Sequence, residues 1–265
     1  MSERHGETGG ESQGDPGAAS AVPAPGEGSV GPEPARVLVV VAHPDDVDFG
    51  AAGVVATFVA AGAEVVYCIV TDGAAGTVDP TIDLSTLAET RQHEQRAAAR
   101  AVGVDEVVFL GYPDGQLEPT REVRRDVSRV IRQVRPDLVL TQSPERNYER
   151  IRASHPDHLA AGEATLRAVY PDARNPYAHP ELLEAGFEPF EVPEVWLMAA
   201  PRPDRAVDIT EVFDKKLAAL ASHRSQIADV EALGVFVRGW AAQTAERFEL
   251  GADRLAEAFQ VVDTR

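Results

Sequence analysis

The sequence predicts an α/β fold of the Rossmann-like kind, with a mostly parallel sheet and helices on both of its faces. From Val37 onward, short runs rich in β-branched residues alternate with longer amphipathic stretches. The first run, residues 37–41 (VLVVV), is apolar throughout, which is typical of a strand covered on both faces. Ligands of such sheets bind beyond the carboxyl ends of the strands. We therefore expect the functional site at that edge.

The alternation of strand and helix continues through the first half of the chain. Gly62 and Gly103 end two of the expected helices, because glycine adopts the backbone conformation that closes a helix. Four strand units separated by helical crossovers indicate a doubly wound sheet. The expected strands are 37–41, 64–70, 106–110 and 137–141, and the expected helices are 50–61, 87–102 and 121–134.

The second half is expected to be more helical. Ser154 is suited to cap a helix over residues 155–169. The proline-rich segment 170–193 is long enough to be an active-site lid. A late strand is expected over 195–198, and the region 210–259 is expected to be mainly helical.

The N-terminal segment differs from the rest in composition. Residues 1–36 hold 8 of the 21 glycines and five prolines, with almost no large apolar side chain. Such a segment buries too little apolar surface to offset the entropy of ordering. We expect a disordered tail over 1–36 and a single catalytic domain over 37–265. No apolar run is long enough for a membrane span and none resembles a signal peptide, so a cytoplasmic location is expected.

Charge and cysteine content narrow the class of protein. The formal net charge of -18 argues against a nucleic-acid partner, because phosphate backbones are bound mainly through Lys and Arg. The single cysteine, Cys68, excludes internal disulfides and multi-thiolate zinc sites and fits a reducing compartment. A small-molecule partner is expected, and both a monomer and a homo-oligomer stay open.

A cluster of polar residues, 42–48 (AHPDDVD), follows the first strand directly. Three carboxylates within four residues repel one another unless a cation or a helix N-terminus stabilises them. An ordinary helix cap is the alternative interpretation. His43 and Pro44, immediately ahead of the carboxylates, favour a functional site instead.

A second cluster, 154–158 (SHPDH), follows the fourth strand. Both clusters should lie at the same edge of the sheet, because parallel strands end at one edge. Three histidine and carboxylate ligands with a fourth position open for water describe a catalytic zinc site. Two clusters that both contain His-Pro-Asp therefore predict a metal centre.

These two motifs, AHPDD and HPDH in that order, resemble the signatures of the PIG-L/LmbE-like superfamily of zinc-dependent N-deacetylases. The similarity runs from about Val37 to the C-terminal helices. The superfamily includes deacetylases of N-acetylglucosaminyl-phosphatidylinositol and of the sugar intermediates of mycothiol and bacillithiol, and amidases of mycothiol conjugates. Weaker supporting segments are 71–77 (TDGAAGT), Arg91 with Glu94, 111–115 (GYPDG) and 223–226 (HRSQ).

The resemblance implies a role for each residue of the two clusters. His43, Asp46 and His158 would bind one Zn²⁺, Asp45 would be the general base, and His155 would face the oxyanion. Asp157 would orient or tune His155. Such a metal polarises the amide carbonyl and lowers the pKa of water, and an adjacent carboxylate can accept the proton. The proton for the leaving nitrogen would come from Asp45 or from His155. Fe²⁺ is the open alternative to zinc, because availability can override the affinity order.

The chain also departs from the superfamily pattern. Many relatives have Glu where this chain has Asp48, and some have a tyrosine where it has Ala153. The nearest phenol, Tyr148, lies in the run 145–152 (ERNYERIR), whose three arginines either recognise an anionic group of the substrate or form ion pairs in a solvated loop.

By resemblance, Arg91 and Asp114 would line the sugar pocket and bind substrate. An i, i+3 ion pair with Glu94 is the alternative for Arg91. Structural roles are expected for His93, His179 and His223.

The leading hypothesis is an enzyme that deacetylates an N-acetylated amino sugar or a related small conjugate. An amidase acting on a thiol conjugate or a natural-product intermediate would share the metal site and differ in its pocket. A non-catalytic ligand-binding module is the alternative from another class. The intact set of expected ligands, together with Asp45 and His155, favours the enzyme.

Overall fold

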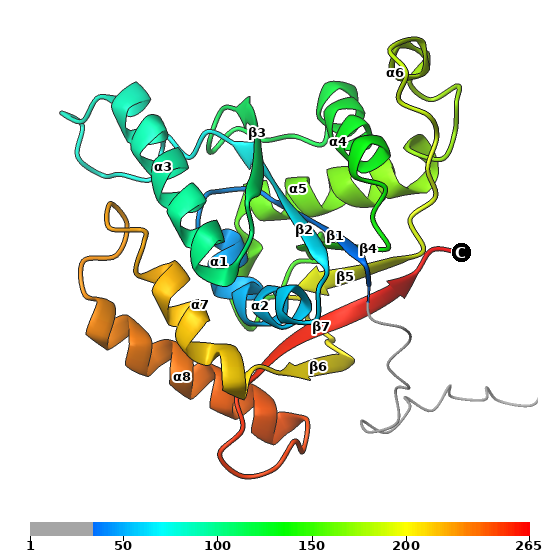
Figure 1. Ribbon diagram of the computed structural model, residues 1–265. Coiled ribbons are helices and arrows are strands. Elements are labelled where there is room, and N and C mark those ends of the chain that lie inside the picture. The colour runs from blue at the N-terminus through cyan, green and yellow to red at the C-terminus, as the bar shows by residue number, and fades with distance from the viewer. Residues whose placement is uncertain (1–33) are drawn as a thin grey trace, which may run out of the picture.

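The computed structural model describes residues 34–265. Residues 1–33, which make up most of the expected tail, lie outside the described residues. The rest of the chain forms a seven-stranded sheet with the strand order β3-β2-β1-β4-β5-β7-β6 (Figure 1).

The central part of the sheet is parallel. β1 (Arg36–Val41) pairs with β2 (Glu64–Thr71) on one side and with β4 (Leu138–Gln142) on the other. β3 (Glu106–Tyr112) extends the sheet beyond β2, and β5 (Glu194–Met198) extends it beyond β4, both in parallel. These strands confirm the predicted α/β class.

The other edge of the sheet is antiparallel. β7 (Ala256–Asp263) runs antiparallel to β5, and β6 (Arg205–Asp208) runs antiparallel to β7. The expectation of a mainly helical region over 210–259 is therefore wrong at its end. Glu257 and Gln260 interrupt the apolar run of β7, so this strand lacks the continuous hydrophobic pattern that marks β1.

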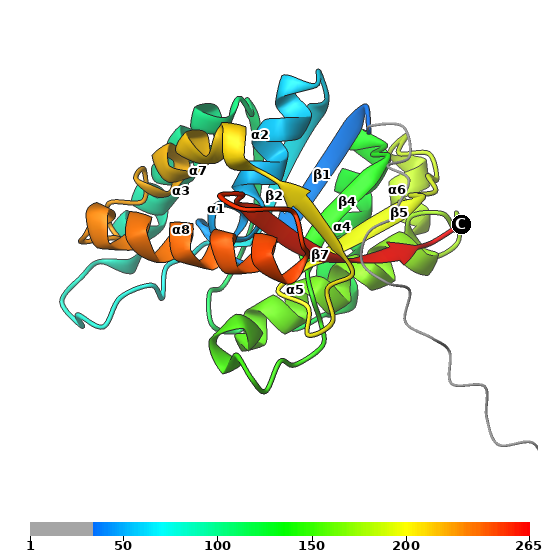
Figure 2. The ribbon, with the colours of Figure 1, turned by 90° about the horizontal axis from the view of Figure 1, so that it is seen from below.

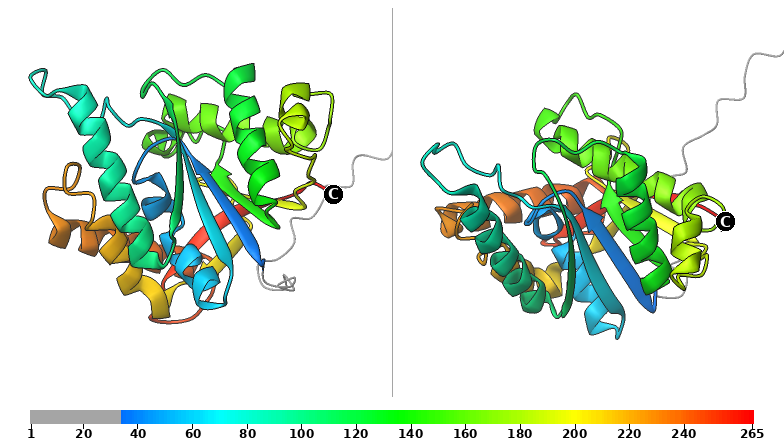
Figure 3. Two further views of the ribbon diagram at one scale, coloured as in Figure 1. Left: turned by 45° about the horizontal axis from the view of Figure 1, so that its top comes forward. Right: turned by 90° about the horizontal axis from the view of Figure 1, so that it is seen from above.

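Helices cover both faces of the sheet (Figures 1 and 3). α2 (Ala52–Ala60) and α3 (Leu84–Val102) pack on one face, and α4 (Arg121–Val134) and α5 (Pro156–Arg167) pack on the other. Alternation along β1 supplies both cores, since successive side chains of a strand point to opposite faces. Val37, Val39 and Val41 belong to the first core, and Leu38, Val40 and Ala42 belong to the second.

A third helical pair lies beside the antiparallel edge (Figure 2). α7 (Phe213–Leu220) and α8 (Val230–Arg247) share a small core that includes Phe213 and Val237. Asp229 caps α8 by accepting from the Ala232 N–H at 2.9 Å. Within residues 34–265, no helix has both the length and the apolar character needed to cross a membrane.

The helix expected over 50–61 is observed as α2, and a short additional helix precedes it. α1 (Asp46–Gly50) begins inside the acidic cluster, and α2 follows after a break at Ala51, where φ is -148° and ψ is 1°. Carboxylates in the first turn favour an early start because they face the positive end of the helix dipole. The first cluster is thus both a helix start and a candidate site, which the sequence presented as alternatives.

A buried ion pair closes the break between these two helices. Lys216 and Glu257 lie 2.6 Å apart. The ammonium of Lys216 also donates to the Phe49 carbonyl at the end of α1, at 2.7 Å. Glu257 accepts from the N–H groups of Gly53 and Val54 in the first turn of α2, at 3.0 and 2.7 Å. The backbone groups freed by the break are therefore satisfied by side chains from α7 and β7.

The segment expected to be a lid packs along α4. It contains a π-helical turn (Ala168–Asp172) and the short helix α6 (Pro180–Glu184). Arg124 of α4 forms an ion pair with Asp172 at 2.8 Å. His179 is buried with Nε2 3.3 Å from the same carboxylate, which agrees with its expected structural role. The segment thus covers α4, which differs from the active-site lid that its length suggested.

Candidate metal centre and catalytic site

The two His-Pro-Asp clusters meet at the carboxyl edge of the sheet. His43 follows β1, and the second cluster begins α5 after the neighbouring strand β4. The side chain of Gln142, the last residue of β4, accepts from the Ala42 N–H at 2.9 Å. A Cβ on Gly162 of α5 would lie 2.2 Å from the Gln142 carbonyl oxygen. Glycine at this position therefore lets α5 approach β4 closely enough to bring the clusters together.

Asp46 lies between two histidines. Its Oδ1 is 2.9 Å from Nε2 of His158, and its Oδ2 is 3.3 Å from Nδ1 of His43. The same Oδ2 accepts from the His43 backbone N–H at 2.7 Å. The structure thus brings together the three residues predicted to bind the metal.

The outer nitrogen of each imidazole faces a hydrogen-bond acceptor. Nε2 of His43 is 3.0 Å from Oδ1 of Asp114 and 3.1 Å from Oδ2 of Asp157. Nδ1 of His158 is 3.5 Å from the Ala153 carbonyl. These acceptors hold the proton of a neutral imidazole on the outer nitrogen, as they do in many metal sites. The inner lone pairs then point at Asp46.

Lone pairs that face a carboxylate repel it unless a cation lies between them or the imidazoles are protonated. Burial of His43 opposes protonation, but Asp46, Asp114 and Asp157 outweigh it and raise the pKa of His43 to about 12. Against the same effect of burial, Asp46 raises the pKa of His158. The site therefore stabilises positive charge, and its two nitrogens and one oxygen are the donor types of a catalytic zinc site.

Other donors lie close to this set. The ligand atoms of His43, His155 and His158 all lie within 4.8 Å of one another, and so do those of His43, Asp114 and Asp157. Asp46 is distinguished from the other carboxylates because it contacts both His43 and His158.

His155 caps the start of α5. Its Nδ1 accepts from the Asp157 N–H at 3.2 Å, so the ring proton lies on Nε2. Burial, followed by the charges of His43 and His158, lowers the pKa of His155. The ring lies edge-on to His43 with centroids 5.0 Å apart. His155 is therefore a neutral imidazole with one N–H available to the site.

Asp157 has a different contact from the one expected. Its carboxylate accepts from the N–H groups of Gly115 and Leu117 at 2.7 and 3.2 Å and faces His43, while only its backbone amide contacts His155. The two loop amides fix the carboxylate in this direction. The Asp157 side chain thus contacts His43 and does not orient His155 as predicted, while its charge acts to raise the pKa of His155 against the larger lowering effect of burial.

Asp45 is the carboxylate next to the expected ligand Asp46. Burial and the charge of Asp46 raise the pKa of Asp45 to about 7. Its Oδ2 lies 3.3 Å from Nη2 of Arg91. A carboxyl group with a pKa near neutrality is suited to general base catalysis.

The side chain of Arg91 points into the protein interior. It is 3% exposed, and its guanidinium donates to the carbonyls of Gly73 and Pro44 at 2.8 and 2.6 Å. Its expected partner in an i, i+3 pair, Glu94, instead accepts from the N–H and the hydroxyl of Ser225 at 2.8 and 2.7 Å. Arg91 therefore fastens the loops around Asp45, and its burial does not favour a direct contact with substrate.

Asp114 is also engaged inside the protein. One of its oxygens faces His43 at 3.0 Å, and the other accepts from the Ala75 N–H at 3.0 Å. It joins the loops after β2 and β3 to the candidate metal site. The predicted substrate contact stays a prediction.

The arginine-rich run after β4 forms internal contacts. The guanidinium of Arg150 lies over the Trp240 ring at 4.8 Å from its centroid, and Arg146 donates to the Ser154 carbonyl at 3.5 Å. Tyr148 is 84% exposed, so its phenol does not replace the tyrosine that some relatives have at Ala153.

A buried polar group beside Asp45 was not predicted. Gln95, Asp48 and His223 are each 0% exposed. Gln95 bridges the backbone of Asp45 and the side chain of Asp48. The sequence did contain a signal for this group: Arg91 and Gln95 are four residues apart in a predicted helix, so their side chains lie on the same face of that helix.

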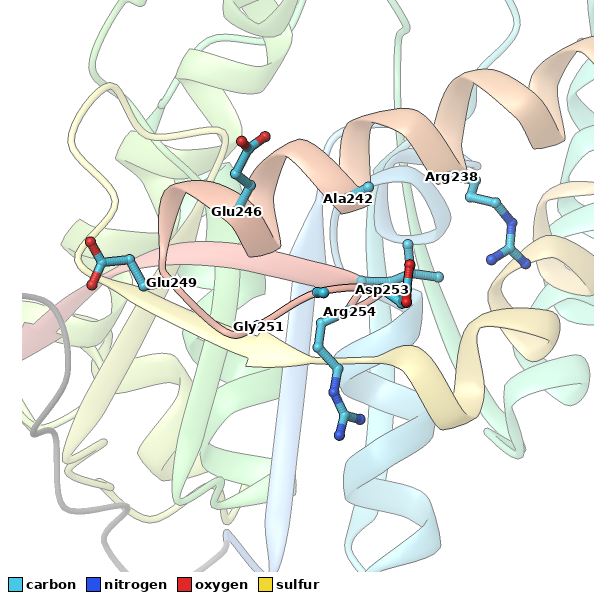
Figure 4. Close-up of a pocket in the computed structure, with 9 residues that line it drawn as sticks. Arg238, Ala242, Glu246, Glu249, Gly251, Asp253 and Arg254 are labelled. Carbon is cyan, nitrogen blue, oxygen red and sulfur yellow. The ribbon is translucent and has the colours of Figure 1, made fainter.

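The surface also carries a hollow away from the candidate metal site. A hollow of about 680 Å³ lies between the C-terminal half of α8 and the turn that leads to β7 (Figure 4). Arg238, Glu246 and Asp253 are among its lining residues. The site is thus recognised by its converging donors and not by this hollow.

Comparisons with known proteins agree with this geometry. Residues 38–169 match the family described as PIG-L, GlcNAc-PI de-N-acetylase. The diacetylchitobiose deacetylase of Thermococcus kodakarensis is 34% identical over 194 residues, which cover 73% of this chain and 71% of that protein. The 1D-myo-inositol 2-acetamido-2-deoxy-alpha-D-glucopyranoside deacetylase of Kineococcus radiotolerans is 32% identical over 256 residues, with 74% and 70% of the two chains covered.

A solved structure gives the same result. The N,N'-diacetylchitobiose deacetylase of Pyrococcus horikoshii, in complex with its inhibitor MPG, superposes with a TM-score of 0.79 at 32% identity. The match covers 87% of this chain and 85% of that chain. The strand order, the two His-Pro-Asp clusters and these matches together establish that the chain belongs to the PIG-L family.

Proposed function

We propose that this protein is a zinc-dependent hydrolase that removes the acetyl group from the amide nitrogen of an N-acetylated amino sugar or a related small conjugate. The observation that carries the proposal is the position of Asp46 between two imidazoles, His43 and His158, with the partly buried carboxylate of Asp45 beside it. The sugar class is supported by the relatives, which are named as deacetylases of diacetylchitobiose and of an acetamido-glucopyranoside of inositol.

His43, Asp46 and His158 would hold the metal. When bound, Zn²⁺ supplies Lewis-acid chemistry, polarising the amide carbonyl and lowering the pKa of water. Fe²⁺ accepts the same donor types, and zinc is favoured by affinity alone.

Asp45 would act as the general base. As the oxygen of water forms its bond to the carbonyl carbon, the Asp45 carboxylate accepts the proton that the water loses. A carboxyl group whose pKa is raised toward neutrality holds a proton well once it has accepted it. Arg91, 3.3 Å away, keeps the carboxylate in position.

His155 would stabilise the charge on the carbonyl oxygen. Its Nδ1 accepts a hydrogen bond from the Asp157 N–H, so the ring proton lies on Nε2. The Nε2–H group can therefore donate to the carbonyl oxygen of the substrate as negative charge develops there. When the C–N bond breaks, the leaving nitrogen takes up a proton. We assign that proton to Asp45, because neutral His155 would have to give up the donor that holds the oxyanion.

Acetate release tests the proposal. The probes are N,N'-diacetylchitobiose and N-acetylglucosamine conjugates, assayed with the purified protein, with the protein after chelator treatment, and again after Zn²⁺ is returned. We expect release to be lost with the chelator and restored by Zn²⁺. Failure of the metal-loaded protein to release acetate from all of these probes would overturn the substrate class, and release that the chelator does not reduce would overturn the metal dependence.

A further inference from the structure

Asp45 has an unusual backbone conformation. Its φ is 99° and its ψ is -26°, in the left-handed region. Non-glycine residues rarely adopt such angles, and they persist only where the surroundings hold them. The direction in which the Asp45 carboxylate leaves the backbone therefore depends on what fixes this peptide.

Both sides of Asp45 are fixed by hydrogen bonds. Its carbonyl accepts from the N–H groups of Asp48 and Phe49 at 2.9 and 3.1 Å, which begins α1. Its own N–H donates to Oε1 of Gln95 at 2.7 Å. Gln95 belongs to α3, a different element of the fold, so it ties the strained residue to the helical layer behind the site.

The amide of Gln95 is itself oriented. Its Nε2 donates to Oδ2 of Asp48 at 2.9 Å, and Nε2 of His223 donates to the same oxygen at 2.7 Å. Oδ2 of Asp48 accepts from the NH₂ side of Gln95, which leaves the carbonyl side of Gln95 for the Asp45 N–H. His223 is the second partner of that Asp48 oxygen.

We propose that Gln95, Asp48 and His223 are positioning residues that hold the Asp45 carboxylate in its catalytic direction through the Asp45 backbone. The inference rests on the function proposed above and assigns a role to residues beyond the metal ligands and the general base. None of the three supplies a proton to the reaction or a ligand to the metal. Their effect is on geometry, and a displacement of about 1 Å at a catalytic group can cost on the order of 10²-fold in rate.

The central test is Gln95→Met, which keeps the length of the side chain and removes both hydrogen bonds. We expect kcat to fall by roughly 10- to 100-fold, with KM and metal content unchanged, because Asp45 neither binds substrate nor holds the metal. Glu94→Gln is the matched control. It weakens the adjacent contact between α3 and Ser225 without touching Asp45, and its kcat should stay near that of the wild type. Equal losses in both variants would overturn the proposal.

Two further measurements distinguish a positioning role of these residues from a general destabilisation of the fold. In an Asp45→Asn background, Gln95→Met should slow the residual rate little, because the group it positions is already inactive. If Gln95→Met slowed the rate of the Asp45→Asn protein as much as it slows the wild type, the proposal that Gln95 acts through Asp45 would be contradicted. His223→Gln retains a side-chain N–H near the position of Nε2 and should keep most of kcat, whereas His223→Leu should lose it as Gln95→Met does.

A readout that does not depend on activity uses amide hydrogen exchange in the metal-free protein. The Asp45 N–H should exchange slowly in the wild type and in Glu94→Gln and markedly faster in Gln95→Met. Unchanged exchange would overturn the proposal even if the protein hydrolysed no sugar amide. A wild type that releases no acetate, combined with the expected exchange pattern, would instead overturn only the proposed function.

Discussion

Helix α1 carries two aspartates that each meet a histidine, and the two pairs differ in their surroundings. Asp46 lies 2.9 Å from His158, and Asp48 lies 2.7 Å from His223. The side chains of the first pair keep 11% and 19% of their surface exposed, whereas those of the second pair keep none. Two residues along one short helix thus separate a pair at the site from a pair inside the protein.

The second contact of each pair separates their roles. The outer nitrogen of His158 faces the Ala153 carbonyl, and Asp46 has a further imidazole, His43, on its other oxygen. In the inner pair, Asp48 accepts from Gln95 as well as from His223. A metal bound by Asp46 and His158 would take the place of a proton between them, whereas Asp48 and His223 are fully buried and the Asp48 oxygen that contacts His223 also accepts from Gln95. Residue types alone do not distinguish a ligand pair from a structural pair.

The largest expected effect comes from removing a histidine of the outer pair. His158→Ala should reduce bound metal from about one ion per chain to near zero and abolish acetate release, because a single tetrahedral site needs three protein ligands. Metal analysis of the purified variant measures this. His223→Gln, from the inner pair, is the matched control and should keep its metal. Equal metal content in wild type and His158→Ala would refute the ligand assignment.

The second largest effect is expected to distinguish the roles of the neighbouring carboxylates Asp45 and Asp46. Asp46→Asn replaces an anionic donor with a neutral amide and should weaken metal retention. Asp45→Asn should keep the metal yet slow turnover by about 10² to 10⁴, the range for loss of a general base. Bound metal and acetate-release rate are measured on both variants. The division of roles fails if Asp45→Asn loses its metal or turns over at a near-normal rate.

A smaller effect concerns stability and pH in the inner pair. Burial opposes protonation of His223, but the hydrogen bond and charge of Asp48, with smaller contributions from Asp45 and Glu94, outweigh it and raise the pKa of His223. Because the pKa of His223 is higher in the folded protein than in the unfolded chain, its protonation stabilises the fold. This stabilisation is complete below the pKa of the unfolded chain, about 6.5, and is lost as the pH rises through the pKa of the folded protein.

We therefore expect His223→Gln to be less stable than the wild type at the acidic end, because the amide keeps a hydrogen bond to Asp48 but lacks the positive charge of the protonated imidazole. The difference should shrink as the pH is raised. Urea unfolding of both proteins over a pH series measures it. A difference that is constant with pH would show that His223 is not protonated in the folded protein.

The smallest effect is expected from the N-terminal segment, which carries neither pair. Deletion of residues 1–34 should leave the thermal midpoint and turnover unchanged, because this segment has almost no large apolar side chain with which to pack. Differential scanning calorimetry and the acetate assay compare the two chains. A marked loss in either would mean that the segment contacts the domain.

The parallel half of the fold could be predicted from sequence because its strands are short apolar runs. The antiparallel edge could not, because β6 (RAVD) and β7 (AEAFQVVD) mix polar and apolar residues. The outer cluster was visible because His-Pro-Asp occurs twice at strand ends. The inner cluster was not, since Gln95, Asp48 and His223 come from three distant segments and meet only through tertiary packing.

The ion pair between Lys216 and Glu257 links the order of synthesis to the completion of the site. Glu257 lies in β7, 204 residues after Gly53, yet its carboxylate holds the first turn of α2 behind the acidic cluster. A nascent chain has made His43, Asp46 and His158 long before it makes Glu257. We expect ribosome-bound chains that stop short of residue 256 to contain every proposed metal ligand and still bind metal weakly, so that metal binding waits for β7.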